Sequence, residues 1–198
     1  MVTSYKALKE IRQYAEENKV PIMQEEGINF LATFIIKHQV KNILEIGSAI
    51  GYSAIMMALC NPDIKVTTIE KDEKRYLEAI KNIKKLELED RITLIFNDAS
   101  EVRLEEKFDL IFIDAAKAKN QLFFERFESN LTEHGFILTD NMLFHGLVEK
   151  EEKEITSRNV LGIVRKIKKY MTFLNNREDF ETTIYRVGDG IAVSRKKQ

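Results

Sequence analysis

Two stretches decide the fold of this chain: Ile111-Phe-Ile-Asp-Ala-Ala-Lys117 and Thr139-Asp-Asn141. Each one ends an apolar strand and continues into side chains that carry oxygen, which are Asp114 in the first stretch and Asp140 and Asn141 in the second. In an open parallel sheet, ligands bind outside the carboxyl ends of the strands. The two stretches therefore predict a ligand site at the edge of a parallel sheet.

The surrounding sequence alternates short apolar strands with amphipathic helices. Strands are expected at 42–46, 65–69, 92–96, 108–113 and 136–139, and helices at 4–18, 24–38, 52–60, 72–86, 118–131 and 155–174. Two final strands, 180–187 and 190–195, flank Gly188-Asp189-Gly190, which is typical of a tight turn. This order predicts an α/β fold, in which a doubly wound, mostly parallel sheet has helices on both faces and an antiparallel last strand.

The composition is that of a globular protein without an obvious charged partner. The chain has 198 residues, 44% of them hydrophobic and 32% charged, and a net charge of −1. This length fits a single domain, 1–198, in which the helices of 1–40 cover the active site of a core formed by 41–198. The lone cysteine, Cys60, suits a reducing compartment, and neither a signal peptide nor a membrane-spanning run is visible. We therefore expect a cytoplasmic protein without a membrane partner.

Acids lie at the ends of the first three expected strands, beside a glycine-containing turn. Gly47 and Gly51 allow the backbone to approach a ligand, although a turn of this kind also needs glycine for packing alone. Glu70 suits a ribose diol, and Asp98 could accept a hydrogen bond from an adenine amino group. Glu45 would repel a pyrophosphate but complement an ammonium group. Each acid alone could be a solvated loop carboxylate, but the three together favour S-adenosylmethionine.

The oxygen-bearing side chains after the fourth and fifth strands suggest a cation site. Asp114, Asp140 and Asn141 offer only oxygen ligands, which favours Mg²⁺, with Mn²⁺ or Ca²⁺ as alternatives. Lys117 could act as a base on a substrate hydroxyl whose pKa the cation lowers. Taken singly, Asp140 and Asn141 could form a turn, and Lys117 could be a solvated lysine at the start of a helix.

These residues together resemble the class I S-adenosylmethionine-dependent O-methyltransferases of the catechol and caffeoyl-CoA type. The resemblance runs from about Val20 to Lys196. Its markers are Glu25-Glu-Gly-Ile-Asn-Phe-Leu31, Leu44-Glu-Ile-Gly-Ser-Ala-Ile-Gly-Tyr-Ser53, Ile113-Asp-Ala-Ala-Lys117, Thr139-Asp-Asn141 and Val187-Gly-Asp-Gly-Ile-Ala192.

The resemblance implies a Rossmann-like seven-stranded sheet with an antiparallel last strand, and a homodimer. It implies metal ligands at Asp114, Asp140 and Asn141 and a catalytic lysine at Lys117. The cofactor contacts that it implies are Met23, Glu45, Gly47, Ser53, Glu70, Asp98, Ala99 and Asp114.

One position departs from the family pattern. Many members carry a second aspartate two residues after the metal aspartate, where this chain has Ala116. The stretches Val20-Pro-Ile-Met23, Asp114-Ala-Ala-Lys117 and Asp140-Asn-Met-Leu-Phe-His-Gly-Leu147 look more like a bacterial branch that contains tRNA 5-hydroxyuridine methyltransferases. These enzymes form 5-methoxyuridine at the wobble position.

The leading hypothesis is a divalent-metal-dependent enzyme that methylates a hydroxyl next to a second oxygen, with 5-hydroxyuridine in tRNA as the favoured acceptor. Basic residues near 158–169 and 195–197 would then contact phosphates. The alternatives are a methyltransferase for small catechol-like phenols, a nicotinamide-dependent oxidoreductase and a catalytically silent binding module. We interpret His145 as an exposed loop histidine.

Overall fold

The computed structural model describes residues 2–197, with side chains from residue 5 onward. The chain clusters into two compact units, of which the first ends at Arg103 and the second begins at Leu104.

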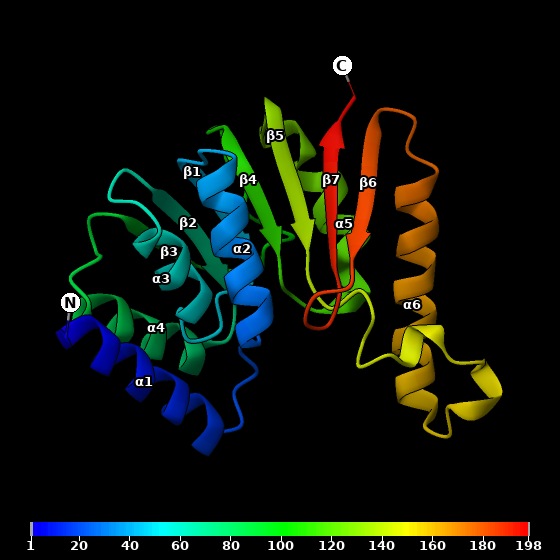
Figure 1. The fold of residues 1–198 in the computed structure, drawn as a ribbon, viewed down its shortest axis with the longest axis horizontal. Coiled ribbons are helices and arrows are strands. Elements are labelled where there is room, and N and C mark those ends of the chain that lie inside the picture. The colour runs from blue at the N-terminus through cyan, green and yellow to red at the C-terminus, as the bar shows by residue number, and fades with distance from the viewer. Residues whose placement is uncertain (1, 198) are drawn as a thin grey trace. The chain divides into compact units, whose positions relative to one another are not determined.

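In the first unit, two helices precede a series of strands that alternate with helices along the chain (Figure 1). Its elements are α1 (Val2–Glu17), α2 (Glu25–Lys37), β1 (Asn42–Ile46), α3 (Tyr52–Leu59), β2 (Lys65–Glu70), α4 (Glu73–Lys85) and β3 (Ile92–Phe96). β1 pairs in parallel with β2, and β2 in parallel with β3. This pairing sets Glu45 of β1 opposite Thr68 of β2, so that the ends of the strands meet at one edge.

The residues that are buried in most of these elements are those expected from the apolar pattern of the sequence. β1 is buried from its second residue onward, and α3 is buried around most of its circumference, as a helix with so few polar residues should be. In α4 the periodicity predicts Leu77 and Ile80 on the buried side, yet they are 50% and 40% exposed. The buried side of α4 instead consists of Ala79, Asn82 and Ile83.

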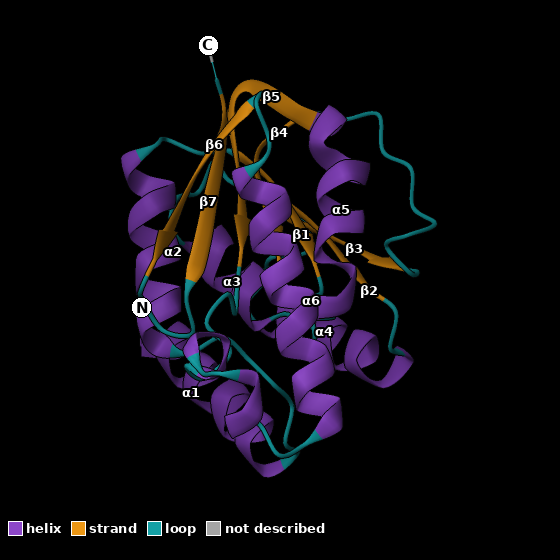
Figure 2. Ribbon diagram, turned by 90° about the vertical axis from the view of Figure 1, so that its right-hand side faces the viewer, coloured by secondary structure: helices purple, strands orange, loops and turns teal. Residues whose placement is uncertain are grey.

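The second unit contains four strands and two α-helices within its described residues. Its elements are β4 (Phe108–Ile113), the 3₁₀ turn η1 (Lys117–Lys119), α5 (Asn120–Phe127), η2 (Glu128–Asn130), β5 (Leu131–Thr139), η3 (Leu147–Glu149), η4 (Glu152–Glu154), α6 (Arg158–Asn175), β6 (Phe180–Tyr185) and β7 (Ile191–Lys196). α5 packs on β4 and β5, and α6 packs on β6 (Figure 2). β4 and β5 are parallel, whereas β7 is antiparallel to both of its neighbours, β5 and β6.

Across residues 2–197 the strands follow the order β3-β2-β1-β4-β5-β7-β6 in a seven-stranded sheet. The predicted α/β class, the mostly parallel sheet and the antiparallel last strand are confirmed. No helix in this described range is long and apolar enough to cross a membrane.

Two neighbouring predicted elements, a helix and the strand after it, were wrong in extent. The helix expected over 118–131 is the short α5, and β5 begins at Leu131 rather than at Phe136. The pairing with β4 jumps from Phe108↔Leu131 to Leu110↔Phe136. The polar residues 132–135 therefore form an irregular, bulged part of the strand, which a sequence pattern of alternating burial does not reveal.

Candidate active site

Glu45, which β1 carries near its carboxyl end, is a fully buried carboxylate with two hydroxyl partners. Its side chain is 0% exposed. The Ser53 hydroxyl donates a hydrogen bond to Oε1, and the Thr68 hydroxyl donates one to Oε2, each at 2.5 Å. Both oxygens of this buried charge therefore have donors, as burial of an ion requires.

The turn between β1 and α3 brings backbone close to the end of β2. Gly47 and Gly51 have φ values of 98° and 82°, a region that favours glycine, and Ala49 between them has φ 46°. The Gly47 N–H donates to the Ile69 carbonyl at 3.0 Å. The Ala49 N–H donates to Glu70 Oε2 at 2.9 Å, so the turn is tied directly to the acid that ends β2.

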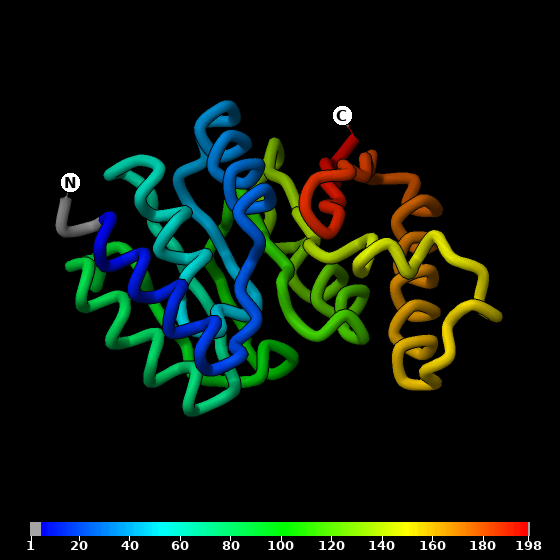
Figure 3. Tube along the Cα trace, turned by 60° about the horizontal axis from the view of Figure 1, so that its bottom comes forward, coloured from blue at the N-terminus to red at the C-terminus, as the bar shows by residue number. Residues whose placement is uncertain are grey.

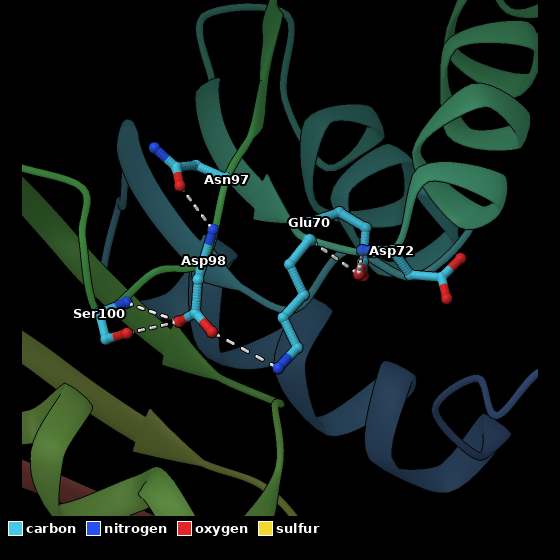
Figure 4. A network of polar contacts seen from close by, with 6 residues as sticks. Glu70, Asp72, Asn97, Asp98 and Ser100 are labelled. Carbon is cyan, nitrogen blue, oxygen red and sulfur yellow. Dashed lines mark hydrogen bonds and ion pairs between the residues drawn. The ribbon is translucent and has the colours of Figure 1, made fainter.

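Glu70 accepts backbone hydrogen bonds from both sides of its strand end. Besides the bond from Ala49, its Oε1 accepts from the N–H groups of Lys71 and Asp72, each at 2.8 Å (Figure 4). The side chain is only 6% exposed. Because a carboxylate has about four acceptor positions, three donors leave about one position for a ligand hydroxyl.

Asp98, after β3, lies in a polar network that continues toward Lys71 (Figure 4). Its Oδ1 accepts from the Ser100 N–H at 2.9 Å and from the Ser100 hydroxyl at 2.7 Å. Its Oδ2 lies 3.5 Å from Lys71 Nζ, and the side chain is 26% exposed. The neighbouring Ala99 is buried, as is Met23, which packs against Gly27 in the first turn of α2.

In the second unit, Asp114 and Asp140 follow β4 and β5. The Asp140 N–H donates to the Ile113 carbonyl at 3.1 Å, so the two strand ends are held together. Burial raises the pKa of Asp114. Burial, followed by repulsion from Asp114, raises the pKa of Asp140 to about 7. The positive charge of Lys117 acts on both carboxyl groups and lowers their pKa values.

Asn141 completes this group of oxygen-bearing side chains. It has φ 62°, and its Nδ2 donates to Asp140 Oδ2 at 3.2 Å. Within residues 2–197 no three or more His, Cys, Asp and Glu side chains form a metal-binding cluster. The candidate donors are thus two mutually repelling carboxylates and one amide, and a hard divalent cation would relieve that repulsion. The donor set fits Mg²⁺, Mn²⁺ or Ca²⁺.

The structure brings the predicted residues into two sets. In the first unit, hydrogen bonds join Glu45 to Ser53 and tie the turn of Gly47 to Glu70. In the second unit, Asp114, Lys117 and Asp140 interact electrostatically.

Two residues that support these sets were not predicted from the sequence. Thr68 was overlooked because a threonine in a strand is ordinary, although its register opposite Glu45 follows from the predicted pairing. Tyr170 of α6 is buried and shares a 2.9 Å hydrogen bond with Thr139, the residue before Asp140. Nothing local in the sequence indicates that long-range contact.

The candidate RNA-binding side chains are partly engaged within the chain. Arg165 pairs with Glu152, and the guanidinium of Arg195 lies 5.5 Å from the centre of the Phe136 ring. Arg158 and Lys169 are exposed. Contacts between these basic residues and phosphates stay a prediction.

A family model described as O-methyltransferase matches residues 2–197. The chain belongs to the O-methyltransferase family. Curated relatives of this O-methyltransferase include a caffeoyl-CoA O-methyltransferase from Populus kitakamiensis, which is 28% identical over 97% of this chain and 87% of its own length. A flavonoid 3′,5′-methyltransferase from Vitis vinifera is also 28% identical, over 94% of this chain and 82% of its own.

Solved structures agree with this O-methyltransferase assignment. A Staphylococcus aureus structure provisionally described as a caffeoyl-CoA O-methyltransferase is 37% identical, with a TM-score of 0.91 over 96% of this chain and 92% of that one. An O-methyltransferase from Bacillus cereus in complex with SAH is 27% identical, with a TM-score of 0.83 over 97% and 91% of the two chains. The Rossmann-like fold is confirmed.

The O-methyltransferase uses S-adenosylmethionine as its methyl donor. This finding excludes the nicotinamide-dependent oxidoreductase and the catalytically silent binding module as alternatives.

Proposed function

We propose that this O-methyltransferase methylates a hydroxyl that lies next to a second oxygen, in a reaction that requires a divalent cation. The observation that carries the proposal is the pair of carboxyl groups formed by Asp140, which is buried, and Asp114, which is partly buried. The pKa of Asp140 lies at about 7 because the group is desolvated and Asp114 repels its charge. Two such groups are unfavourable together in their ionised forms unless a cation joins them.

The first unit would hold the methyl donor. We propose that Glu45 and Ser53, which are hydrogen-bonded to each other, bind its ammonium and carboxylate end, with Met23 beside it. Glu70 has about one acceptor position left for a ribose hydroxyl. Gly47 lets backbone approach the donor. Asp98 and the neighbouring Ala99 would contact the adenine.

The second unit would bind the acceptor. Asp114, Asp140 and Asn141 would hold the cation, and we propose that Asp114 also contacts the methyl donor. When bound, the cation supplies Lewis-acid polarisation of two neighbouring acceptor oxygens, and S-adenosylmethionine supplies the methyl group. Lys117, in its neutral amine form, would then accept the acceptor's hydroxyl proton at Nζ. A positioned base of this kind contributes about 10²- to 10⁴-fold to the rate.

Two acceptors present the required pair of oxygens. In 5-hydroxyuridine the 5-hydroxyl neighbours the 4-carbonyl, and a catechol has two neighbouring hydroxyls. We favour 5-hydroxyuridine at the wobble position of tRNA, with exposed Arg158 and Lys169 of α6 as phosphate contacts. The relatives named for caffeoyl-CoA and flavonoid substrates support the small-phenol alternative.

Labelled methyl transfer distinguishes the acceptors. The enzyme is incubated with methyl-labelled S-adenosylmethionine, Mg²⁺ and either catechol or tRNA that contains unmethylated 5-hydroxyuridine. Label in 5-methoxyuridine, with little in catechol, would support the tRNA acceptor. Label only in catechol would replace it with the phenol acceptor, and label in neither would reject the vicinal-oxygen proposal.

We also propose that the enzyme is a homodimer, as the family resemblance implies. Light scattering coupled to size-exclusion chromatography checks this. A mass near 23.1 kDa, that of one chain, would contradict it.

A further inference from the structure

The turn between β6 and β7 packs against the segment that follows Asn141 (Figure 3). The Leu143 N–H donates to the Asp189 carbonyl at 2.8 Å, and the Met142 N–H donates to the Gly190 carbonyl at 2.9 Å. A Cβ placed on Gly190 would lie 2.5 Å from Leu143 Cγ. The turn is thus in close contact with the chain just beyond the proposed cation ligands.

The side chain of Asp189 points into this contact. This side chain is only 6% exposed. One carboxylate oxygen accepts a hydrogen bond from the His145 N–H, and the other lies 3.6 Å from Nδ1 of the His145 ring. A tight turn needs glycines for its backbone, but it does not need a buried acid. The burial of Asp189 therefore requires another explanation.

The segment that Asp189 binds has an unusual backbone. Phe144, His145 and Gly146 have φ values of 46°, 56° and 75°, and Asn141 has φ 62°. Non-glycine residues rarely adopt this left-handed region, and they hold it only where the surroundings compensate for the strain. The buried Asp189 carboxylate provides such compensation, because it accepts the His145 N–H in the middle of the left-handed stretch.

We propose that Asp189 is a positioning residue that holds residues 141–146, called here the acceptor loop, in the conformation that aims Asp140 and Asn141 at the cation. The inference rests on the proposed cation site. It gives a role to the Val187-Gly-Asp-Gly-Ile-Ala192 motif beyond that of a turn. Supporting residues that orient metal ligands commonly change metal affinity by about 10- to 100-fold.

Three variants distinguish the effect of the Asp189 hydrogen bond from the effect of its charge and from a general loss of stability. Asp189→Asn keeps an oxygen that can accept the His145 N–H but removes the charge, whereas Asp189→Ala removes both. Asp179→Ala is the matched control. Asp179 precedes the other end of β6 and pairs with Arg177 at 2.6 Å, so its loss perturbs the same unit away from the acceptor loop.

The first readout is the affinity for Mn²⁺ alone, measured by calorimetry above the Asp140 pKa of about 7. The proposal predicts that Asp189→Ala weakens Mn²⁺ binding by about 10-fold or more, while Asp179→Ala stays close to wild type. Asp189→Asn should weaken binding less than Asp189→Ala, because it keeps the acceptor for the His145 N–H and removes only the charge that acts on Asp140. Equal weakening in both Asp189 variants would assign the effect to charge and overturn the proposal. Unchanged binding in Asp189→Ala would overturn it as well.

The second readout is amide hydrogen exchange in the acceptor loop, which does not depend on the cation. Exchange at residues 142–146 should accelerate in Asp189→Ala but not in Asp179→Ala. If wild-type protein binds no Mn²⁺, the proposed cation site fails, and the exchange result still decides whether Asp189 holds the loop. Exchange that is unchanged in Asp189→Ala would refute the positioning role.

Discussion

The hydroxyl of Thr68 should stabilise the folded protein through its bond to the buried Glu45. Thr68→Val keeps the shape of the side chain but removes a 2.5 Å hydrogen bond to a carboxylate that is 0% exposed. A hydrogen bond to a charged group contributes about 1.5–3 kcal/mol. We therefore expect the free energy of unfolding to fall by about 1.5–3 kcal/mol, which for a chain of this size is several degrees in Tm.

Thr67→Val is the matched control. Thr67 is the neighbouring threonine in β2, where it is half-buried, and its change should stay within about 0.5 kcal/mol. The assay is urea unfolding followed by circular dichroism, since the chain has no tryptophan for fluorescence. If Thr68→Val costs no more than Thr67→Val, then the hydroxyl does not support Glu45 and our account of this strand end is wrong.

Further predictions concern catalysis, pH and backbone. Lys117→Ala should lower turnover by about 10²- to 10⁴-fold. Calorimetry should show that this variant still binds S-adenosylmethionine. Undiminished turnover would show that Lys117 takes no part in the reaction. Without cation, the pKa of Asp140 is raised from 3.8 to about 7. Between these pH values the folded state therefore holds a proton that the unfolded state has released. The free energy of unfolding should fall as the pH rises through this range. Urea unfolding should show that Asp140→Asn flattens this slope, and an unchanged slope would argue against a raised pKa at Asp140. Gly162 in α6 has nothing within 4 Å of a built Cβ, so Gly162→Ala should raise the unfolding free energy by about 0.5–1 kcal/mol. Gly190→Ala should lower it by about 1–3 kcal/mol, because Gly190 has φ 84° and no room beside Leu143. The same denaturation assay checks both glycines, and effects of equal sign and size would contradict the structural difference between the two positions.

Much of the fold could be predicted because strand ends and acids recur at regular intervals. Glu45 and Glu70 were placed correctly at the carboxyl-end edge of parallel strands, since the apolar runs before them are short and β-rich. Their hydrogen-bond partners could not be predicted. The Thr68 hydroxyl depends on strand register, and the Ala49 N–H depends on a left-handed turn.

The proposed role of Asp189 could not be predicted from the sequence for a different reason. In the sequence it lies between two glycines and is typical of an exposed turn. Its burial arises only when the turn packs on Leu143 and His145, more than forty residues earlier in the chain. The start of β5 was missed because the polar residues 132–135 pair irregularly with β4.

The most direct test of the central claim is the cation dependence of methyl transfer. Labelled transfer from S-adenosylmethionine to 5-hydroxyuridine-containing tRNA or catechol is measured after treatment with chelator and again after Mg²⁺ is restored, in wild type and in Asp140→Asn. We predict that chelation abolishes transfer, that Mg²⁺ restores it in wild type, and that Asp140→Asn responds weakly to Mg²⁺. Full transfer in chelator, or an unchanged Mg²⁺ response in Asp140→Asn, would contradict the claim that Asp114 and Asp140 form a catalytic cation site.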